Sequence, residues 1–113
     1  GAYQDIQSLA LQVRQQSGRE PVVIPGDSRE LRRVAWCSGG AQGFFEGAIA
    51  AGADVFLTGE ISEPQAHYAR ETGVAFLGCG HHASERYGVQ ALGAALATEL
   101  GLAHEFIEID NPA

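Results

Sequence analysis

The stretch Val74-Ala75-Phe76-Leu77-Gly78-Cys79-Gly80-His81-His82-Ala83-Ser84-Glu85-Arg86 decides the fold of this chain. Four apolar residues come first, a glycine-rich turn follows, and a long helical pattern begins at His81. This order is typical of a buried parallel strand that leads into a crossover helix. His81 and Glu85 are four residues apart, so the helix places both on one face, where imidazole and carboxylate can bind the same cation.

The same design occurs twice more upstream, each time as a strand, a loop with glycine, a helix and a closing glycine. Strands that alternate with helices predict one α/β domain over residues 1–113, with a mostly parallel sheet and helices on both faces. The ligand-binding rim is expected at the carboxyl ends of the strands. The predicted strands are 22–24, 33–37, 54–58, 74–77 and 104–109, and the predicted helices are 6 to near Gly18, 44–51, 62–72 and 81–100.

The apolar residues of these elements supply the expected core. Trp36 lies inside a predicted strand and is expected in the core rather than on a stacking surface. Cys37 and Cys79 each end a predicted strand without a CxxC motif, so we expect two reduced, buried thiols, although a disulfide between neighbouring strand ends stays open. Ser62 and Gln65 predict a capping box at a helix start. The inner stripe of the last helix is predicted to be Val89, Leu92, Leu96 and Leu100.

The charge balance excludes several classes of partner. The 113 residues carry 7 Lys+Arg, all of them Arg, against 14 Asp+Glu, for a net charge of −7. An acidic chain without a basic run argues against nucleic acid and against an anionic membrane. A phosphorylated small molecule needs only local positive charge or a metal, so it stays open. No apolar run approaches the roughly 18 residues of a membrane helix and no secretory signal is visible, so we expect a cytoplasmic protein.

Three loops are expected side by side on the rim, namely 38–40, 59–60 and 80–82. Glu60 directly follows a strand end, which is typical of a catalytic or supporting carboxylate, although a simple turn residue fits equally well. Ser38, Gly39 and Gly40 can cradle an anion with their backbone N–H groups, but a tight strand-to-helix turn explains the glycines equally well.

Other polar residues near the rim have two readings each. His81 and Glu85 can be metal ligands, or a capping histidine and a glutamate favoured by the helix dipole. His82 points about 100° away from its neighbour, which makes it a pocket residue rather than a ligand of the same ion. Arg86 can bind an oxyanion or form a surface ion pair. His67 pairs with Glu63 on a solvated helix face or lines the rim.

Three stretches, read in order, show a family resemblance: residues 34–40, residues 57–62 and residues 80–86. Together with the ending Ile109-Asp110-Asn111-Pro112-Ala113, they resemble the C-terminal half of the Ngg1-interacting-factor-like dinuclear metal proteins, also called type 2 GTP cyclohydrolase I homologues. The resemblance covers nearly all of residues 31–113 and, more loosely, the helix before them.

The resemblance implies a two-part α/β protein that assembles into a hexameric ring, with two divalent metal ions between the halves. It assigns His81 and Glu85 as metal ligands, and it places Glu60 and His67 close to the site. The other ligands, a His-His pair and an Asp, belong to an N-terminal half that is not present here. Zinc, iron, manganese and magnesium are not distinguished by these residues.

Three functions follow as hypotheses. The first is half of a dinuclear-metal-dependent hydrolase of the GTP cyclohydrolase I type 2 kind, with Glu60 as the catalytic candidate and the isolated chain inactive. The second is a non-catalytic assembly or regulatory module with a structural metal. The third is an anion-binding domain that uses residues 38–40. The expected partners are the missing half, further copies of the chain and a phosphorylated small molecule.

Overall fold

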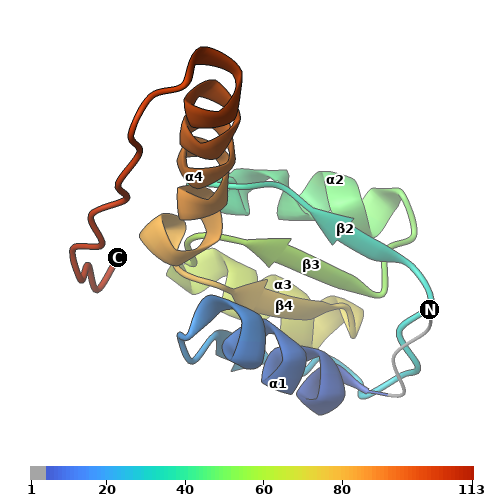
Figure 1. Cartoon of the computed structure of the whole chain (residues 1–113). Helices are drawn as coiled ribbons and strands as arrows, with labels where there is room; N and C mark the ends of the chain where they lie inside the picture. Colours follow the sequence, from blue (N-terminus) through green and yellow to red (C-terminus); the bar gives the residue numbers. More distant parts are fainter. Residues whose placement is uncertain (1–4) are drawn as a thin grey trace.

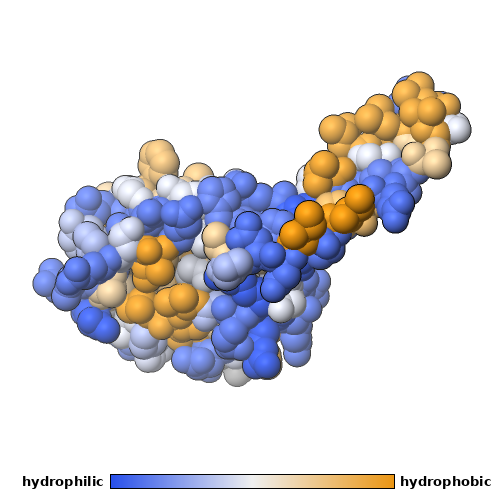
Figure 2. Space-filling view, turned by 90° about the vertical axis from the view of Figure 1, so that its left-hand side faces the viewer, coloured by the Kyte–Doolittle hydropathy of each residue, from blue (hydrophilic) through white to orange (hydrophobic). Residues whose placement is uncertain are grey.

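A computed structural model describes residues 5–113 and contains one four-stranded sheet flanked by helices (Figure 1). The strand order is β1-β4-β3-β2; β2, β3 and β4 are parallel and β1 is antiparallel to β4. The far end of α4 stands clear of the body of the molecule (Figure 1, Figure 2). The elements are α1 (Ile6–Ser17), β1 (Val22–Ile24), β2 (Val34–Trp36), the 3-10 helix η1 (Gln42–Phe44), α2 (Phe45–Ala50), β3 (Val55–Thr58), α3 (Glu63–Thr72), β4 (Ala75–Gly78) and α4 (His81–Leu100).

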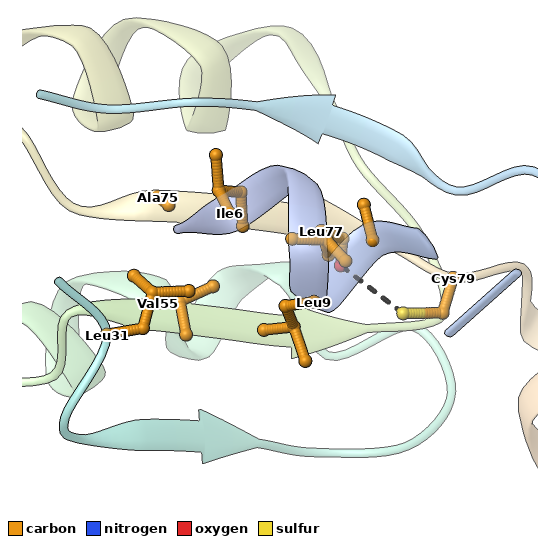
Figure 3. Packing of buried hydrophobic residues seen from close by; sticks show 8 residues of the cluster. Ile6, Leu9, Leu31, Val55, Ala75, Leu77 and Cys79 are labelled. Carbon is orange, nitrogen blue, oxygen red and sulfur yellow. Dashed lines mark hydrogen bonds between the residues drawn. The ribbon is translucent and has the colours of Figure 1, made fainter. Parts of the chain in front are cut away.

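Two apolar clusters cover the two faces of the sheet, which confirms the predicted α/β layers. On one face, Ile6 and Leu9 of α1 pack over Val55 and Leu77 (Figure 3). Side chains alternate across a strand, so Phe56 of β3 and Phe76 of β4 point to the opposite face, under α2 and α3. The buried rings on that face are Phe45, Phe56 and Phe76, with centroids 5.0–5.9 Å apart.

The local signals at helix ends are also confirmed. α1 ends at Gly18, whose φ of 71° is the left-handed geometry that glycine adopts without strain. At the start of α3, the Ser62 N–H donates to Gln65 Oε1 at 3.1 Å as part of the predicted capping box.

Trp36 and Cys37 are exceptions to the predicted core. Trp36 is 77% exposed, because it ends the edge strand β2 and no described helix covers it. Cys37 is exposed whereas Cys79 is buried, and both are free. β3 lies between the strands that carry them, so the two cysteines follow strands about 10 Å apart. A disulfide requires Cα atoms within about 7 Å, so the fold rules out this bond without backbone movement.

The prediction of a buried stripe along α4 was wrong. Within α4, only Ala83 is buried. The helix leaves the sheet after its first turns, so that its later turns have no described neighbour except the extended residues 102–113 (Figure 1). No helix among residues 5–113 is both long enough and apolar enough to cross a membrane. The four stripe residues Val89, Leu92, Leu96 and Leu100 are 43–61% exposed.

The predicted strand at 104–109 is also absent from the sheet. The segment is extended but carries no regular secondary structure. Its place beside α4 explains this, because a strand needs a neighbouring strand with which to exchange backbone hydrogen bonds.

Candidate metal site

The three predicted rim loops meet at the carboxyl ends of β2, β3 and β4. The Gly59 N–H donates to Gly39 O at 2.9 Å, and the Gly80 N–H donates to Gly59 O at 2.9 Å. Backbone hydrogen bonds therefore place residues 38–40, 59–60 and 80–82 side by side, as the parallel topology predicted.

Gly59 makes this close approach of backbones feasible. A Cβ at this position would lie 2.7 Å from Gly39 O and 2.8 Å from His81 Cα. Both neighbours are main-chain atoms and cannot move aside as a flexible side chain would. Any larger residue would therefore separate the loops that carry the site.

His81 lies between two carboxylates at this rim. Its Nδ1 is 2.6 Å from Glu60 Oε1, and its Nε2 is 3.1 Å from Glu85 Oε2. Glu85 comes from the next turn of the same helix, whereas Glu60 comes from the loop after β3. All three side chains are partly open to solvent, so the group is accessible to a ligand.

The neighbouring carboxylates change the protonation of His81. The hydrogen bond to Glu60 raises the pKa of His81 above its ordinary value, and the charges of Glu85 and Glu60 add to this effect. Partial desolvation acts in the opposite direction but does not prevail. Without a bound cation, His81 therefore favours the protonated form more than an isolated histidine does.

Gly39 lets the first loop pass directly over the His81–Glu85 pair. Its φ is +72°, and a Cβ there would lie 2.9 Å from Glu85 Oε1 and 3.3 Å from His81 Nε2. Gly40 is close to the other carboxylate, since a Cβ there would lie 3.3 Å from Glu60 Oε1. The loop 38–40 that we considered as an anion cradle thus lies against two carboxylates.

Thr58 holds this loop in place, and the sequence analysis missed it. Its buried hydroxyl donates to Gly39 O at 3.0 Å and accepts from the Ala41 N–H at 3.2 Å. The sequence feature that could have identified Thr58 is a hydroxyl residue at the end of a buried strand, immediately before the Gly59-Glu60 loop.

His82 and Arg86 contact the chain's last segment instead of the His81 group. His82 Nε2 and Arg86 Nη1 each lie 3.0 Å from Glu108 Oε1. These contacts lower the pKa of Glu108, the His82 hydrogen bond most strongly and that of Arg86 next. A cleft of about 540 Å³ nevertheless adjoins both histidines, Glu85, Arg86 and the apolar residues Phe106 and Ile107.

His67 is the one predicted pocket residue that the fold leaves elsewhere. It is exposed on α3, with Nε2 3.6 Å from Glu63 Oε1. Among the described residues, no hydrogen bond or ion pair joins it to His81. Its assignment as pocket lining therefore stays a prediction.

The geometry suits two ligands of one metal ion, but not a complete site. Two ligand atoms about 2.1 Å from one ion lie ~3.0–3.4 Å apart, and the 3.1 Å between His81 Nε2 and Glu85 Oε2 fits this range. Glu60 bonds the opposite ring nitrogen, so the three donors do not converge on one point. Within residues 5–113, no group of three or more His, Cys, Asp or Glu residues is placed to hold a metal ion.

Comparison with known protein families matches almost the whole chain. The model of Duf34/NIF3 (NGG1p interacting factor 3) matches residues 2–112. A GTP cyclohydrolase 1 type 2 homolog of Pseudomonas aeruginosa is 53% identical over 105 residues, which are 93% of this chain and 41% of the relative. A protein of the same name from Neisseria meningitidis serogroup B is 56% identical over 106 residues, 94% of this chain and 43% of the relative.

Solved structures give the same result. The protein ybgI, described as of unknown function, superposes with a TM-score of 0.92 at 40% identity and covers 100% of this chain. TTHA1606 from Thermus thermophilus superposes with a TM-score of 0.85 at 28% identity. This chain covers 46% and 45% of those two chains, so it spans less than half the length of the relatives it matches. On this sequence match and shared fold, the chain belongs to the Duf34/NIF3 (NGG1p interacting factor 3) family.

Proposed function

We propose that this chain is the metal-binding half of a dinuclear-metal-dependent hydrolase, to which it contributes His81 and Glu85 as ligands. The observation that carries the proposal is the 3.1 Å separation of His81 Nε2 and Glu85 Oε2 on one helix face. The relatives' name, GTP cyclohydrolase 1 type 2 homolog, suggests GTP or a similar phosphorylated small molecule as substrate.

In this proposal, Glu60 acts through His81. Its carboxylate accepts the Nδ1–H of His81, which keeps the imidazole oriented and leaves the Nε2 lone pair for an ion. Ligation requires an unprotonated Nε2, so binding an ion releases the proton that the raised pKa of His81 retains. When bound, divalent ions activate water for attack on an electrophile.

The proposed site needs ligands from outside this chain. A zinc ion takes about four ligands and an octahedral ion about six, whereas His81 and Glu85 supply two. The relatives are more than twice as long as the matched region, which leaves room for a second ligand set. We therefore expect the isolated chain to bind metal weakly and to lack hydrolytic activity.

The cleft beside the ligands supports a phosphorylated substrate. Arg86 supplies positive charge on its wall, His82 supplies a hydrogen-bonding imidazole, and Phe106 and Ile107 supply apolar surface. Both polar side chains contact Glu108 in this structure. A bound phosphate would compete with this carboxylate for them.

A full-length hybrid tests the ligand assignment. In this hybrid, the present chain replaces the matched region of the P. aeruginosa relative, and metal content per chain is measured after dialysis against trace zinc or manganese. We expect His81→Ala and Glu85→Gln to lose metal, with His67→Ala as the matched histidine control that retains it. Two ions still bound in His81→Ala would refute the assignment. A separate assay for product released from GTP then shows whether the hybrid that binds metal also hydrolyses this substrate.

A second proposal is that the metal supports assembly only and has no catalytic role. The exposed apolar surface of α4 favours it, because such a surface needs a partner. It predicts that chelation changes the mass of the hybrid in solution, from a hexamer to smaller species, while no phosphorylated substrate is hydrolysed. Mass measurement by light scattering with and without chelator distinguishes the two proposals.

A further inference from the structure

We propose that Arg19, His82 and Arg86 form a binding site for phosphate groups, and that residues 108–113 occupy this site until a phosphorylated ligand displaces them. We call the three residues the phosphate site and residues 108–113 the strap. The phosphate site deepens the proposed function and rests on it in one respect, namely that the ligand of the candidate metal site carries phosphate groups.

Arg19 lies over the first turn of α4, although it follows α1 in the sequence. A Cβ at Gly80, the N-cap of α4, would lie 2.6 Å from Arg19 Cδ and 2.8 Å from Arg19 Cζ. Gly80 therefore leaves the space that this side chain fills. Arg19 Nη1 donates to Ala113 O at 2.7 Å, and the His82 N–H donates to the same oxygen at 3.2 Å. A guanidinium and a main-chain N–H at a helix start both bind oxyanions, so Ala113 O occupies a position that suits a phosphate oxygen.

A second oxygen of the strap lies against the other two side chains of the phosphate site. Glu108 Oε1 accepts from Arg86 Nη1 at 3.0 Å and lies 3.0 Å from His82 Nε2. The side chains of Arg86 and His82 are 23% and 31% exposed, whereas that of Glu108 is 43% exposed. The carboxylate is thus the outer and more accessible partner. Arginine binds phosphate as it binds carboxylate, and a phosphate group brings more oxygens and more negative charge than the carboxylate that it would replace.

The strap separates two crevices that share part of the phosphate site. Residues 109, 111 and 113 line the cleft of about 540 Å³ beside the candidate metal ligands. Residues 108 and 110–112 line a crevice of about 440 Å³ that reaches Arg19. His82 and Arg86 line both spaces. Release of the strap would therefore join them into one cleft from Arg19 to the metal ligands, which suits a chain of phosphates better than a single phosphate.

The carboxylates near the phosphate site do not prevent anion binding once the strap leaves. Glu108 and Asp110 belong to the strap and leave with it. Glu20 also lines the crevice, but its Oε2 lies 3.0 Å from Arg14 Nε, so its charge is partly balanced. The positive charges of Arg19 and Arg86 then face an approaching anion without the two acidic side chains of the strap.

Few contacts hold the strap in place. All six of its residues are exposed and carry no regular secondary structure. Among the described residues, the hydrogen bonds that join it to the rest of the molecule come from Arg19, His82 and Arg86 (Figure 1). A segment with little buried surface and an exposed backbone opens at low free-energy cost. A ligand that competes for these three residues can therefore displace the strap.

Binding of inorganic pyrophosphate to the metal-free 113-residue chain tests the phosphate site. Isothermal titration calorimetry at low ionic strength measures the affinity after metal and chelator have been removed by dialysis. Glu108→Gln removes the competing charge and should tighten binding about fivefold. Glu105→Gln is the matched control. It makes the same change of charge at an exposed residue that forms no ion pair within residues 5–113, and it should leave the affinity unchanged.

Arginine substitutions test the same site from the other side. Arg19→Gln and Arg86→Gln should each weaken pyrophosphate binding about tenfold, because each removes a charge-assisted hydrogen bond to the anion. Arg70→Gln, at an exposed position of α3, is the matched control and should bind as the parent does. Displacement of the strap has its own measurement: the ¹⁵N heteronuclear NOE of the amides of residues 109, 110, 111 and 113 should fall towards that of a free chain end as pyrophosphate saturates the chain.

Three results would overturn the inference. The first is equal affinity of Glu108→Gln and Glu105→Gln, or no binding to either. The second is pyrophosphate binding during which the strap keeps its NOE values. The third is an equal loss of affinity in Arg19→Gln and Arg70→Gln, which would show general attraction by charge only. None of these results bears on His81 and Glu85, whose assignment is read from the metal content of the hybrid. Displacement of the strap together with two ions still bound in His81→Ala would refute the ligand assignment alone.

Discussion

Replacing Thr58 with valine removes the hydroxyl that holds the rim loop while keeping the side-chain shape. The substitution leaves the Ala41 N–H without a partner, and Ala41 is buried. Gly39 O stays bonded, since the Gly59 N–H also donates to it at 2.9 Å. One orphaned buried donor costs about 1–3 kcal/mol, so we expect the free energy of unfolding to fall by that amount. In a domain of this size each kcal/mol lowers the midpoint of thermal unfolding by roughly 4 °C.

Urea unfolding of the isolated chain, followed by circular dichroism with chelator present, measures this change. Thr98→Val is the matched control, because the Thr98 hydroxyl donates to Ala94 O at 3.0 Å on an exposed part of α4. We expect the control to stay within about 0.5 kcal/mol of the parent. Faster exchange of the Ala41 amide should accompany the loss of stability in Thr58→Val. Equal stability of both variants would refute the view that this hydroxyl anchors the loop.

Three further predictions concern the core, the thiols and a surface ion pair. Phe76→Ala removes a fully buried ring and should lower the free energy of unfolding by about 3–5 kcal/mol in urea titrations. Burial raises the pKa of Cys79 to about 11, so at pH 8 a maleimide should modify the exposed Cys37 and leave Cys79 intact, as read by mass spectrometry. The hydrogen bond from Arg29 lowers the pKa of Asp27 to about 2, so the stability from this pair is present above about pH 4 and lost as the pH falls through about 2. Carboxyl NMR titration should show that pKa rising towards the ordinary value in Arg29→Gln.

Local signals in the sequence predicted the elements well. The capping box of Ser62 and Gln65 and the left-handed Gly18 depend on contacts within one turn of the chain. Apolar runs separated by glycine loops predicted β2, β3 and β4 to within about a residue at each end. Such features are set by backbone geometry and by neighbours close in sequence, so they can be predicted from the sequence alone.

Burial was not predictable in the same way. The spacing of Leu92 and Leu96 shows that α4 has an apolar face, but spacing does not show which surface covers it. Tryptophan is a residue type that often lies in a protein core, yet the strand that carries Trp36 lies at the sheet edge. The strand pattern at 104–109 likewise requires a neighbouring strand, which the described part of this chain does not offer.

The candidate site likewise has features that depend on local sequence and features that depend on tertiary packing. The sequence by itself determined that His81 and Glu85 share a helix face, because four residues make about one helical turn. Only the tertiary structure decided that Glu60 bonds the other nitrogen of His81, that Gly39 passes over the pair and that Thr58 holds Gly39. Glu60 and His81 are 21 positions apart in the chain, and Gly39 and Thr58 are 19 apart. They meet because parallel strands bring successive loops to one edge of the sheet.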